Sequence, residues 1–244
     1  MGRAISQLAA GLSLFIGAAA LAQSGLTPLD SGGAGKPPPP WRVVGLPSDN
    51  KGKPYTQFTL ETVDGHRALK IDADRSYGNL VHNLAETKPA GKLSWRWRVD
   101  VANDKADLKA KGGDDRVLEI CAAFALPLDK VPFLDRQTLK VASSLSSEPI
   151  PPASVCYTWD ITQPTGTVLD NAFSRRKRMI IVRGTGSPLK TWSTETRDLG
   201  ADFVKLFGDE SKEVPPLIGL SIGGDTDNTQ LHTVGWIADL ELRP

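Results

Sequence analysis

Strict alternation of apolar and polar residues over positions 93–99 is the feature that most constrains this chain. Trp95 and Trp97 occupy one side of the segment, and Arg96 and Arg98 occupy the other. Successive side chains of a β-strand point to opposite faces of a sheet, so a period of two is typical of a strand that is buried on one face only. The segment therefore predicts a strand with its indoles in the core and its guanidinium groups facing outward.

Similar segments recur along the chain and are separated by clusters of Gly, Pro, Asn and Asp. The further strand candidates are residues 69–73, 116–125, 155–160, 179–183, 217–222 and 233–242. The 23 glycines and 18 prolines exceed the usual share of these residues, which favours a turn-rich chain over a helical bundle.

Two short helices are expected between the strand candidates. Leu134, Thr138 and Val141 fall on one face of a segment that follows Pro132, and residues 202–207 show helical spacing before Gly208, a plausible C-cap. Loops rather than regular helices separate most strands, which disfavours a parallel doubly wound sheet. We predict a mainly β protein, an antiparallel β-sandwich of the jelly-roll kind with one or two short helices.

The N-terminal region has the composition of an export signal. Arg3 precedes an apolar stretch over residues 8–19, and residues 20–22 form an A-x-A cleavage site. We expect a signal peptide over residues 1–22, a Gly/Pro-rich disordered linker over residues 23–40 and a single β-sandwich domain over residues 41–244. The predicted location is the periplasm or the exterior, with no transmembrane segment left after signal removal.

Charge and composition limit the partners and cofactors. Lys and Arg total 29 and Asp and Glu total 28, so no basic excess points to nucleic acid. Three His and two Cys are too few for a rich zinc-type site. Cys121 and Cys156 both lie in strand candidates, and an oxidising compartment would permit a disulfide between them. A disulfide and a pair of buried free thiols both remain open.

Several ordered motifs together resemble the DUF3047 family of uncharacterised exported bacterial proteins. They are LSWRWRV at 93–99, GDDRV at 113–117, CYTW at 156–159, WSTETRDL at 192–199, DF and FG within 202–208, and DTDNT at 225–229. The resemblance covers about residues 41–244. It implies a signal peptide followed by one domain, and it implies no catalytic residue, because the role of the family is not established.

Arg96 and Arg98 are the leading ligand-binding candidates, together with Glu119 and Trp192. An outward arginine binds carboxylate or phosphate through two parallel hydrogen bonds, which suits an acidic sugar or another anion. Trp192 lies near a turn and could serve as a stacking platform for a sugar. The alternative is that acidic residues such as Glu119 pair with these arginines on a solvated polar face.

Asp225, Asp227 and Asn228 form the densest group of oxygen ligands, and Ca²⁺ prefers such ligands. An EF-hand register fails, because Gln230 stands where Gly is needed and Trp236 where Glu is needed. A calcium site outside the EF-hand class, with ligands from residues 114–115, remains open. So does a turn whose Asp and Asn side chains bond their own backbone.

The sequence leaves the function open between three classes. Gly219–Gly223 matches the G-x-S-x-G pattern, but Ser221 lies inside a strand candidate rather than at a strand-to-helix turn. We expect an exported, non-catalytic β-sandwich that binds a glycan or an acidic envelope component. The alternatives are a carbohydrate-active enzyme, either a polysaccharide lyase or a glycoside hydrolase, and a structural envelope protein.

Overall fold

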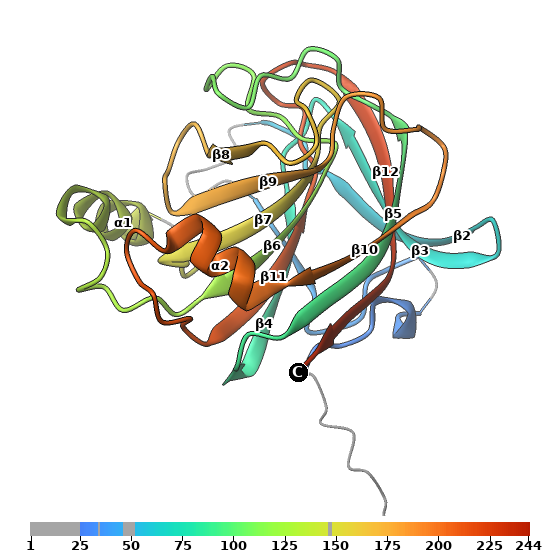
Figure 1. The fold of residues 1–244 in the computed structure, drawn as a ribbon. Helices are drawn as coiled ribbons and strands as arrows, with labels where there is room; N and C mark the ends of the chain where they lie inside the picture. The colour runs from blue at the N-terminus through green and yellow to red at the C-terminus, as the bar shows by residue number, and fades with distance from the viewer. Residues whose placement is uncertain (1–24, 34, 46–51, 146–147) are drawn as a thin grey trace, which may run out of the picture.

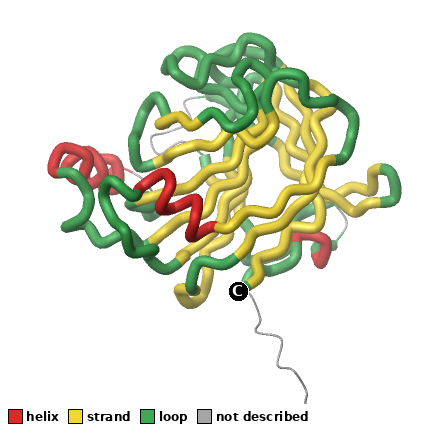
Figure 2. Tube along the Cα trace, in the orientation of Figure 1, coloured by secondary structure: helices red, strands yellow, loops and turns green. Residues whose placement is uncertain are grey.

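The computed structural model describes residues 25–33, 35–45, 52–145 and 148–244 of the chain. The signal peptide predicted for residues 1–22 lies outside the described residues and stays a prediction. Two β-sheets pack face to face (Figure 1), and strands make up most of the ordered elements (Figure 2). The mainly β sandwich predicted from the sequence is confirmed.

The larger sheet has seven strands in the order β1-β4-β11-β6-β7-β9-β8. These strands are β1 (Arg42–Val44), β4 (Asn79–Lys88), β6 (Leu118–Phe124), β7 (Ala153–Trp159), β8 (Val168–Asp170), β9 (Lys177–Arg183) and β11 (Leu217–Gly223). Neighbouring strands are antiparallel except β7 and β9, which run parallel. The sequence pattern gave no sign of this parallel pair.

The smaller sheet has five strands in the order β10-β5-β12-β3-β2, and all its pairs are antiparallel. These strands are β2 (Gln57–Val63), β3 (His66–Asp74), β5 (Lys92–Val101), β10 (Ser193–Asp198) and β12 (His232–Arg243). The sequence analysis missed β10, whose residues are all polar, because an edge strand with little burial shows no hydrophobic alternation.

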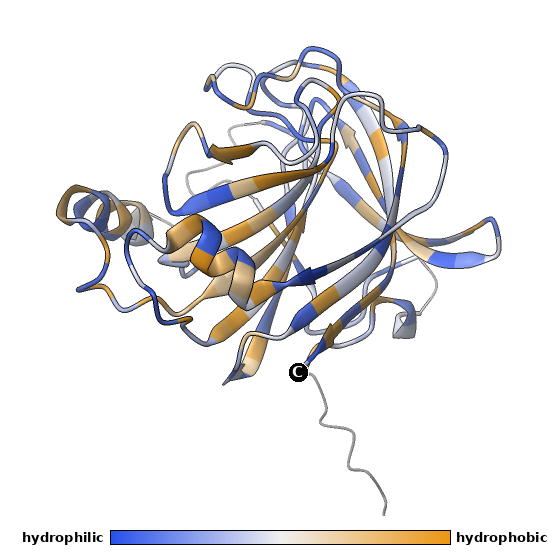
Figure 3. Ribbon diagram, viewed as in Figure 1, coloured by the Kyte–Doolittle hydropathy of each residue, from blue (hydrophilic) through white to orange (hydrophobic). Residues whose placement is uncertain are grey.

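The main core fills the space between the sheets. Trp95 and Trp97 of β5 are almost completely buried there, and the two indoles meet edge to face with ring centroids 5.3 Å apart. Trp97 also packs edge to face on Trp159 of β7, which joins the two layers. Arg96 and Arg98 point to the outer face, as the period of two predicts. The colouring in Figure 3 shows hydrophobic and hydrophilic residues alternating along several strands.

Helix α2 (Leu199–Phe207) covers one open side of the sandwich, where it contacts β7 and β10 (Figure 1). Phe203 packs on Phe124 of β6 with ring centroids 4.9 Å apart. The helix begins before the predicted residue 202, because Asp198 caps it by accepting a hydrogen bond from the backbone N–H of Ala201. Helix α1 (Phe133–Leu145) lies at the edge of the sandwich. In the described part of the chain, no helix is long and apolar enough to span a membrane.

Residues 25–33 and 35–41, which we call the strap, cover another side of the sandwich. A 3-10 turn, η1 (Leu29–Ser31), contacts β3 and β12, and Leu26 and Leu29 are buried in the main core. The structure thus differs from the disordered linker predicted for residues 23–40. The prediction weighed Gly and Pro content and overlooked isolated apolar side chains, which add burial energy once the sheets provide a place for them.

A disulfide joins Cys121 of β6 to Cys156 of β7, two residues that lie directly opposite each other in the sheet. Met179, Ile181 and Leu108 surround it in a small second core on the outer face of the seven-stranded sheet. The loop that contains Leu108 therefore covers part of this face.

Candidate functional site

The outer face of the five-stranded sheet carries a group of cationic and aromatic side chains, which we call the arginine–tryptophan face. It consists of His66, Lys70, Arg96, Arg98, Trp192 and Trp236. The strand register fixes its layout, because Trp236 of β12 is paired with Lys70 on one side and Arg98 on the other. Arg96 faces the small side chain of Ala238 in the next row, and Trp192 enters from the residue before β10.

Arg98 is neutralised by its neighbours. Its guanidinium binds both carboxylate oxygens of Asp100 and also reaches Asp64. The hydrogen bond to Asp100 raises the pKa of Arg98 above its ordinary value. For this residue the structure supports the alternative of internal pairing, and little of the guanidinium is left for a ligand.

Arg96 is in a different situation. Its Nη1 lies 3.1 Å from Nε2 of His66, and its nearest carboxylate in the described chain, Asp239, is 3.8 Å away, beyond hydrogen-bond distance. The guanidinium carbon lies 5.7 Å from the ring centroid of Trp192, close enough for a cation–π contact. The side chain is 30% exposed, so a cation without a bonded carboxylate stands next to an indole at the surface.

The two indoles of this face pack against small residues. Trp236 and Trp192 pack against Ala68 and Ala238 in a cluster separate from the main core. Lys70 lies over the Trp236 ring, with 5.8 Å from its Nζ to the ring centroid. The Nε1 donors of both indoles have no hydrogen-bond partner among the described residues. Within the described chain, the indole donors of Trp95 and Trp159 in the main core also lack a partner, so this feature does not distinguish the face.

Glu119 was expected to join Arg96 and Arg98, but the structure places it on the other sheet. Glu119 lies on β6, on the outer face of the seven-stranded sheet, where it pairs with Lys177 of β9. Its Oε2 also accepts a hydrogen bond of 3.1 Å from Thr158. Of the four predicted ligand-binding residues, the structure brings Arg96 and Trp192 into contact, leaves Arg98 neutralised next to them and separates Glu119.

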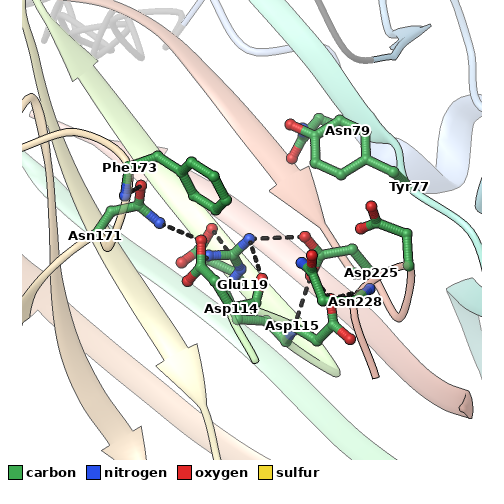
Figure 4. Close-up of polar contacts among 12 residues, drawn as sticks. Tyr77, Asn79, Asp114, Asp115, Glu119, Asn171, Phe173, Asp225 and Asn228 are labelled. Atoms are coloured by element: carbon green, nitrogen blue, oxygen red, sulfur yellow. Dashed lines mark hydrogen bonds and ion pairs between the residues drawn. The ribbon is translucent and has the colours of Figure 1, made fainter. Parts of the chain in front are cut away.

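Glu119 belongs to a second group, the buried polar cluster, which consists of Asp114, Arg116, Glu119 and Asp225. Figure 4 labels its three acidic residues. Arg116 donates to Asp114 at 3.0 Å and to Asp225 at 2.7 Å, and its Nε lies 3.7 Å from Glu119. All four side chains are less than 8% exposed. Asn171 donates a further hydrogen bond to Asp114 from the loop after β8.

In this cluster, the pKa values of Asp225 and Glu119 are shifted in opposite directions. Burial raises the pKa of Asp225 to about 6, although Arg116 opposes the shift. Burial also acts on Glu119, but Lys177 and Arg116 outweigh it and lower its pKa. Burial and the charge of Asp225 raise the pKa of Tyr77 to about 12. Two carboxyls with divergent pKa values are typical of acid–base catalysis.

A substrate nevertheless has little access to the carboxyl groups of this cluster. Glu119 is 2% exposed and Asp225 is 4% exposed, and both bind cations and donors from the same chain. A general acid or base needs to come within hydrogen-bond reach of a substrate. What the arrangement does is join the loop before β6 to the loop after β11.

The predicted metal ligands lie in the loop after β11. Carboxylate oxygens of Asp115, Asp225 and Asp227 come within 4.8 Å of one another, and these are the residues that could hold a cation. The side-chain amide of Asn228 lies beside them and donates its N–H to Asp115. Asp115 also accepts from the backbone N–H of Thr229 at 2.6 Å, and Asp227 binds Lys53 at 2.5 Å. Each carboxylate is thus already bonded to a donor, which comes from a distant segment of the chain and not, as the alternative had expected, from the backbone of its own turn.

Comparison with known proteins places the chain in a family. The family described as "Protein of unknown function (DUF3047)" matches residues 39–241. The chain belongs to the DUF3047 family. No curated protein matches this DUF3047 chain.

Solved structures resemble the DUF3047 chain at low sequence identity. A mutant of CBM29-2, a family 29 carbohydrate binding module, is 11% identical, with a TM-score of 0.32, and the match covers 84% of this chain and 82% of that one. The endoglucanase 3 of Trichoderma harzianum, from family GH12, is 7% identical, with a TM-score of 0.39, over 84% and 97% of the two chains. The xyloglucanase domain of NopAA from Sinorhizobium fredii is 8% identical, with a TM-score of 0.39, over 83% and 97%.

The sequence did not predict two contacts in this DUF3047 chain, one on the arginine–tryptophan face and one in the buried polar cluster. His66 comes from a strand far from Arg96 in sequence, and only the sheet order β5-β12-β3 brings the two side chains together. Arg116 directly follows Asp114 and Asp115, so the dense charge of this motif was visible. Its partnership with Asp225 depends on two loops that meet in space, which no spacing in the sequence indicates.

Proposed function

We propose that the arginine–tryptophan face binds a glycan, with a carboxylate-bearing sugar as the preferred class, and that the protein is a non-catalytic binding module. The observation that carries this proposal is the Arg96 guanidinium beside Trp192 with no carboxylate at hydrogen-bond distance in the described chain. The proposal rests on this chain's own side chains.

The two residues supply complementary parts of sugar recognition. An indole offers a flat apolar surface to the C–H face of a sugar ring, and its N–H can bind a hydroxyl oxygen. A guanidinium binds a carboxylate through charge-assisted hydrogen bonds, which are about twice as strong as neutral ones. With Arg98 neutralised by Asp64 and Asp100, the face offers one available cation rather than a basic patch. That favours a sugar with a single acidic group over a densely charged polyanion.

The burial of the carboxyl groups supports a binding role over catalysis. Glu119 and Asp225 have the divergent pKa values of an acid–base pair, yet both lie beneath the surface and bind groups of their own chain. On the face that carries the indoles, the acid nearest to Arg96 in the described chain is Asp239, which is 58% exposed.

A glycan array of neutral and uronic-acid oligosaccharides, followed by titration of the best hits, tests the proposal. Trp192→Ala and Arg96→Ala should each weaken binding by about tenfold or more, since residues at the centre of a site contribute more than about 1 kcal/mol. Arg175→Ala is the matched control, because this arginine is 53% exposed and lies on another part of the surface. Binding that is absent from the array, or equal in all three variants, would contradict the proposal.

We also propose that the protein is exported to the periplasm or secreted. The N-terminal pattern with Arg3 and the A-x-A site at residues 20–22 supports it, and so does the disulfide, since such bonds persist in oxidising compartments. N-terminal sequencing of the protein recovered from its native cells should find Gln23 as the first residue. A retained Met1 would contradict export through this signal.

A further inference from the structure

The strap connects the two sheets through a small number of contacts. Leu26 and Leu29 are buried, and Arg67 of β3 donates hydrogen bonds to the backbone oxygens of Gly32 and Gly33 at 2.8 and 3.0 Å. These contacts hold the strap to the five-stranded sheet. One wall of a cavity of about 440 Å³ is formed by the strap, and the other wall comes from the C-terminal half of β12.

A histidine holds the strap to the seven-stranded sheet. The Nε2 atom of His82 on β4 accepts a hydrogen bond of 3.0 Å from the backbone N–H of Thr27. Trp41 donates its indole N–H to the backbone oxygen of Thr27 at 2.8 Å and packs edge to face on the His82 ring, 4.9 Å away. His82 is 1% exposed, and its Nδ1 has no partner among the described residues.

This hydrogen bond requires an unprotonated Nε2. An imidazole nitrogen accepts a hydrogen bond only when it carries no proton, and the imidazolium ion donates from both nitrogens. A proton on Nε2 would place two donors, the ring N–H and the Thr27 N–H, against each other. The positive charge would also lie in an apolar site, where an unpaired charge costs far more than in water.

Backbone groups of His82 and Asn83 favour the protonated ring, but burial is the larger effect and opposes it. Arg42 of β1, already paired with Glu148, is the charged group that acts on His82, and it opposes protonation. The strap contributes Thr27 and Trp41, and β11 contributes Leu220 opposite His82 in the register; none of these titrates in the acidic range. Burial lowers the pKa of His82 most, and the positive charge of Arg42 lowers it further.

We propose that the strap is an acid-released closure: protonation of His82 breaks its bond to Thr27 and opens this side of the sandwich. Arg67 and the leucine contacts then hold residues 25–33 to the five-stranded sheet, while β1 still ties the C-terminal end of the strap to β4. Opening exposes apolar side chains of the strap and of the cavity beneath it, while the two sheets stay paired. The proposal is independent of glycan binding, because the strap and the arginine–tryptophan face share no residue.

Hydrogen–deuterium exchange of the intact protein tests the closure. Peptides that contain residues 25–33 are compared with peptides from β5 and β12 at about pH 8 and about pH 5, the range over which histidine changes charge, after correction for intrinsic exchange rates. Strap protection should fall at least about tenfold on acidification while β5 and β12 stay protected; tenfold corresponds to about 1.4 kcal/mol of opening free energy.

Two variants separate the histidine from other acid effects. His82→Gln keeps a side-chain acceptor for Thr27 but does not titrate, so its strap should stay protected at both pH values. His232→Gln is the matched control, since this exposed histidine binds Asp72 far from the strap, and it should open like the wild type.

Several outcomes would overturn the proposal. They are equal strap protection at both pH values in the wild type, the same loss of protection in His82→Gln as in the wild type, and simultaneous loss of protection in β5. If His82→Gln does not fold, an NMR titration of His82 in the wild type replaces it. Strap exchange should then follow the protonation of His82, and exchange with a different midpoint would overturn the closure.

Discussion

Arg116, in the loop before β6, and Arg96, on β5, have opposite surroundings. Arg116 is buried and meets three carboxylates, those of Asp114, Asp225 and Glu119. Arg96 is 30% exposed and has, in the described chain, no carboxylate at hydrogen-bond distance, while Trp192 lies beside it. The buried polar cluster holds more charge, yet every one of its members is bonded within the chain.

The comparison teaches that charge density does not locate a binding site in this fold. Buried charges have to be paired, so a dense acidic and basic motif is what two tightly joined loops require. A group available to a ligand is one whose partners are missing. By this criterion we propose the arginine–tryptophan face as the binding site and a stabilising role for the buried polar cluster in the loops around β6 and β11.

The largest effect is expected from removing the central cation of the cluster. Arg116→Met leaves three carboxylates without their shared partner and should lower the free energy of unfolding by about 3–5 kcal/mol, the usual cost of breaking a buried ion pair. Urea denaturation measures it. Arg175→Met, at an exposed pair, is the control and should change stability by less than about 1 kcal/mol. Similar small losses in both variants would show that the cluster is not structural.

The disulfide next to the cluster should have a comparable effect. Replacing Cys121 and Cys156 together by Ala opens a cross-link with a sequence separation of 35 residues. The expected loss is about 2–5 kcal/mol, because the unfolded chain gains conformational freedom. Thermal denaturation of the double variant measures it, and an unchanged midpoint would contradict the assignment of this face to stability.

The titration of Asp225 should make the free energy of unfolding depend on pH, in a direction that its pKa fixes. The pKa of Asp225 is about 6 in the folded protein, above its ordinary value of 3.8, so the folded state binds the proton more tightly than the unfolded state. The contribution of Asp225 to stability therefore falls as the pH rises from about 4 to about 6, by up to about 3 kcal/mol.

The difference in unfolding free energy between the wild type and Asp225→Asn isolates this group. Glu119 is present in both proteins, so the difference reports mainly the titration of Asp225. Wild-type stability relative to the variant should decline over this pH window. A relative stability that instead rises with pH would mean that Arg116 outweighs burial at Asp225.

Arg96 should show the reverse pattern to Arg116. Arg96→Ala removes no hydrogen-bonded carboxylate partner, so the unfolding free energy should change by less than about 1 kcal/mol. The same substitution should weaken binding of a uronic-acid oligosaccharide by about tenfold or more. A large loss of stability without a change in binding would remove the contrast between the two arginines.

The sequence predicted the layers of this fold better than its contacts. Alternation correctly assigned Trp95 to the core and Arg96 to the outside, because that pattern follows directly from strand geometry. The order of strands in each sheet has no such local signal, so the separation of Glu119 from Arg96 and the approach of His66 were not predictable. The strap was missed because its few apolar side chains become buried only when both sheets are present.

Indole N–H resonances in a two-dimensional ¹⁵N NMR spectrum test the central claim most directly, since each of the six tryptophans gives one signal. Addition of the glycan that the array identifies should shift the signals of Trp192 and Trp236. The signals of Trp95, Trp97 and Trp159, which lie between the sheets, should stay in place. Shifts confined to the backbone around Tyr77 and Asn79, beside the buried polar cluster, would contradict the account.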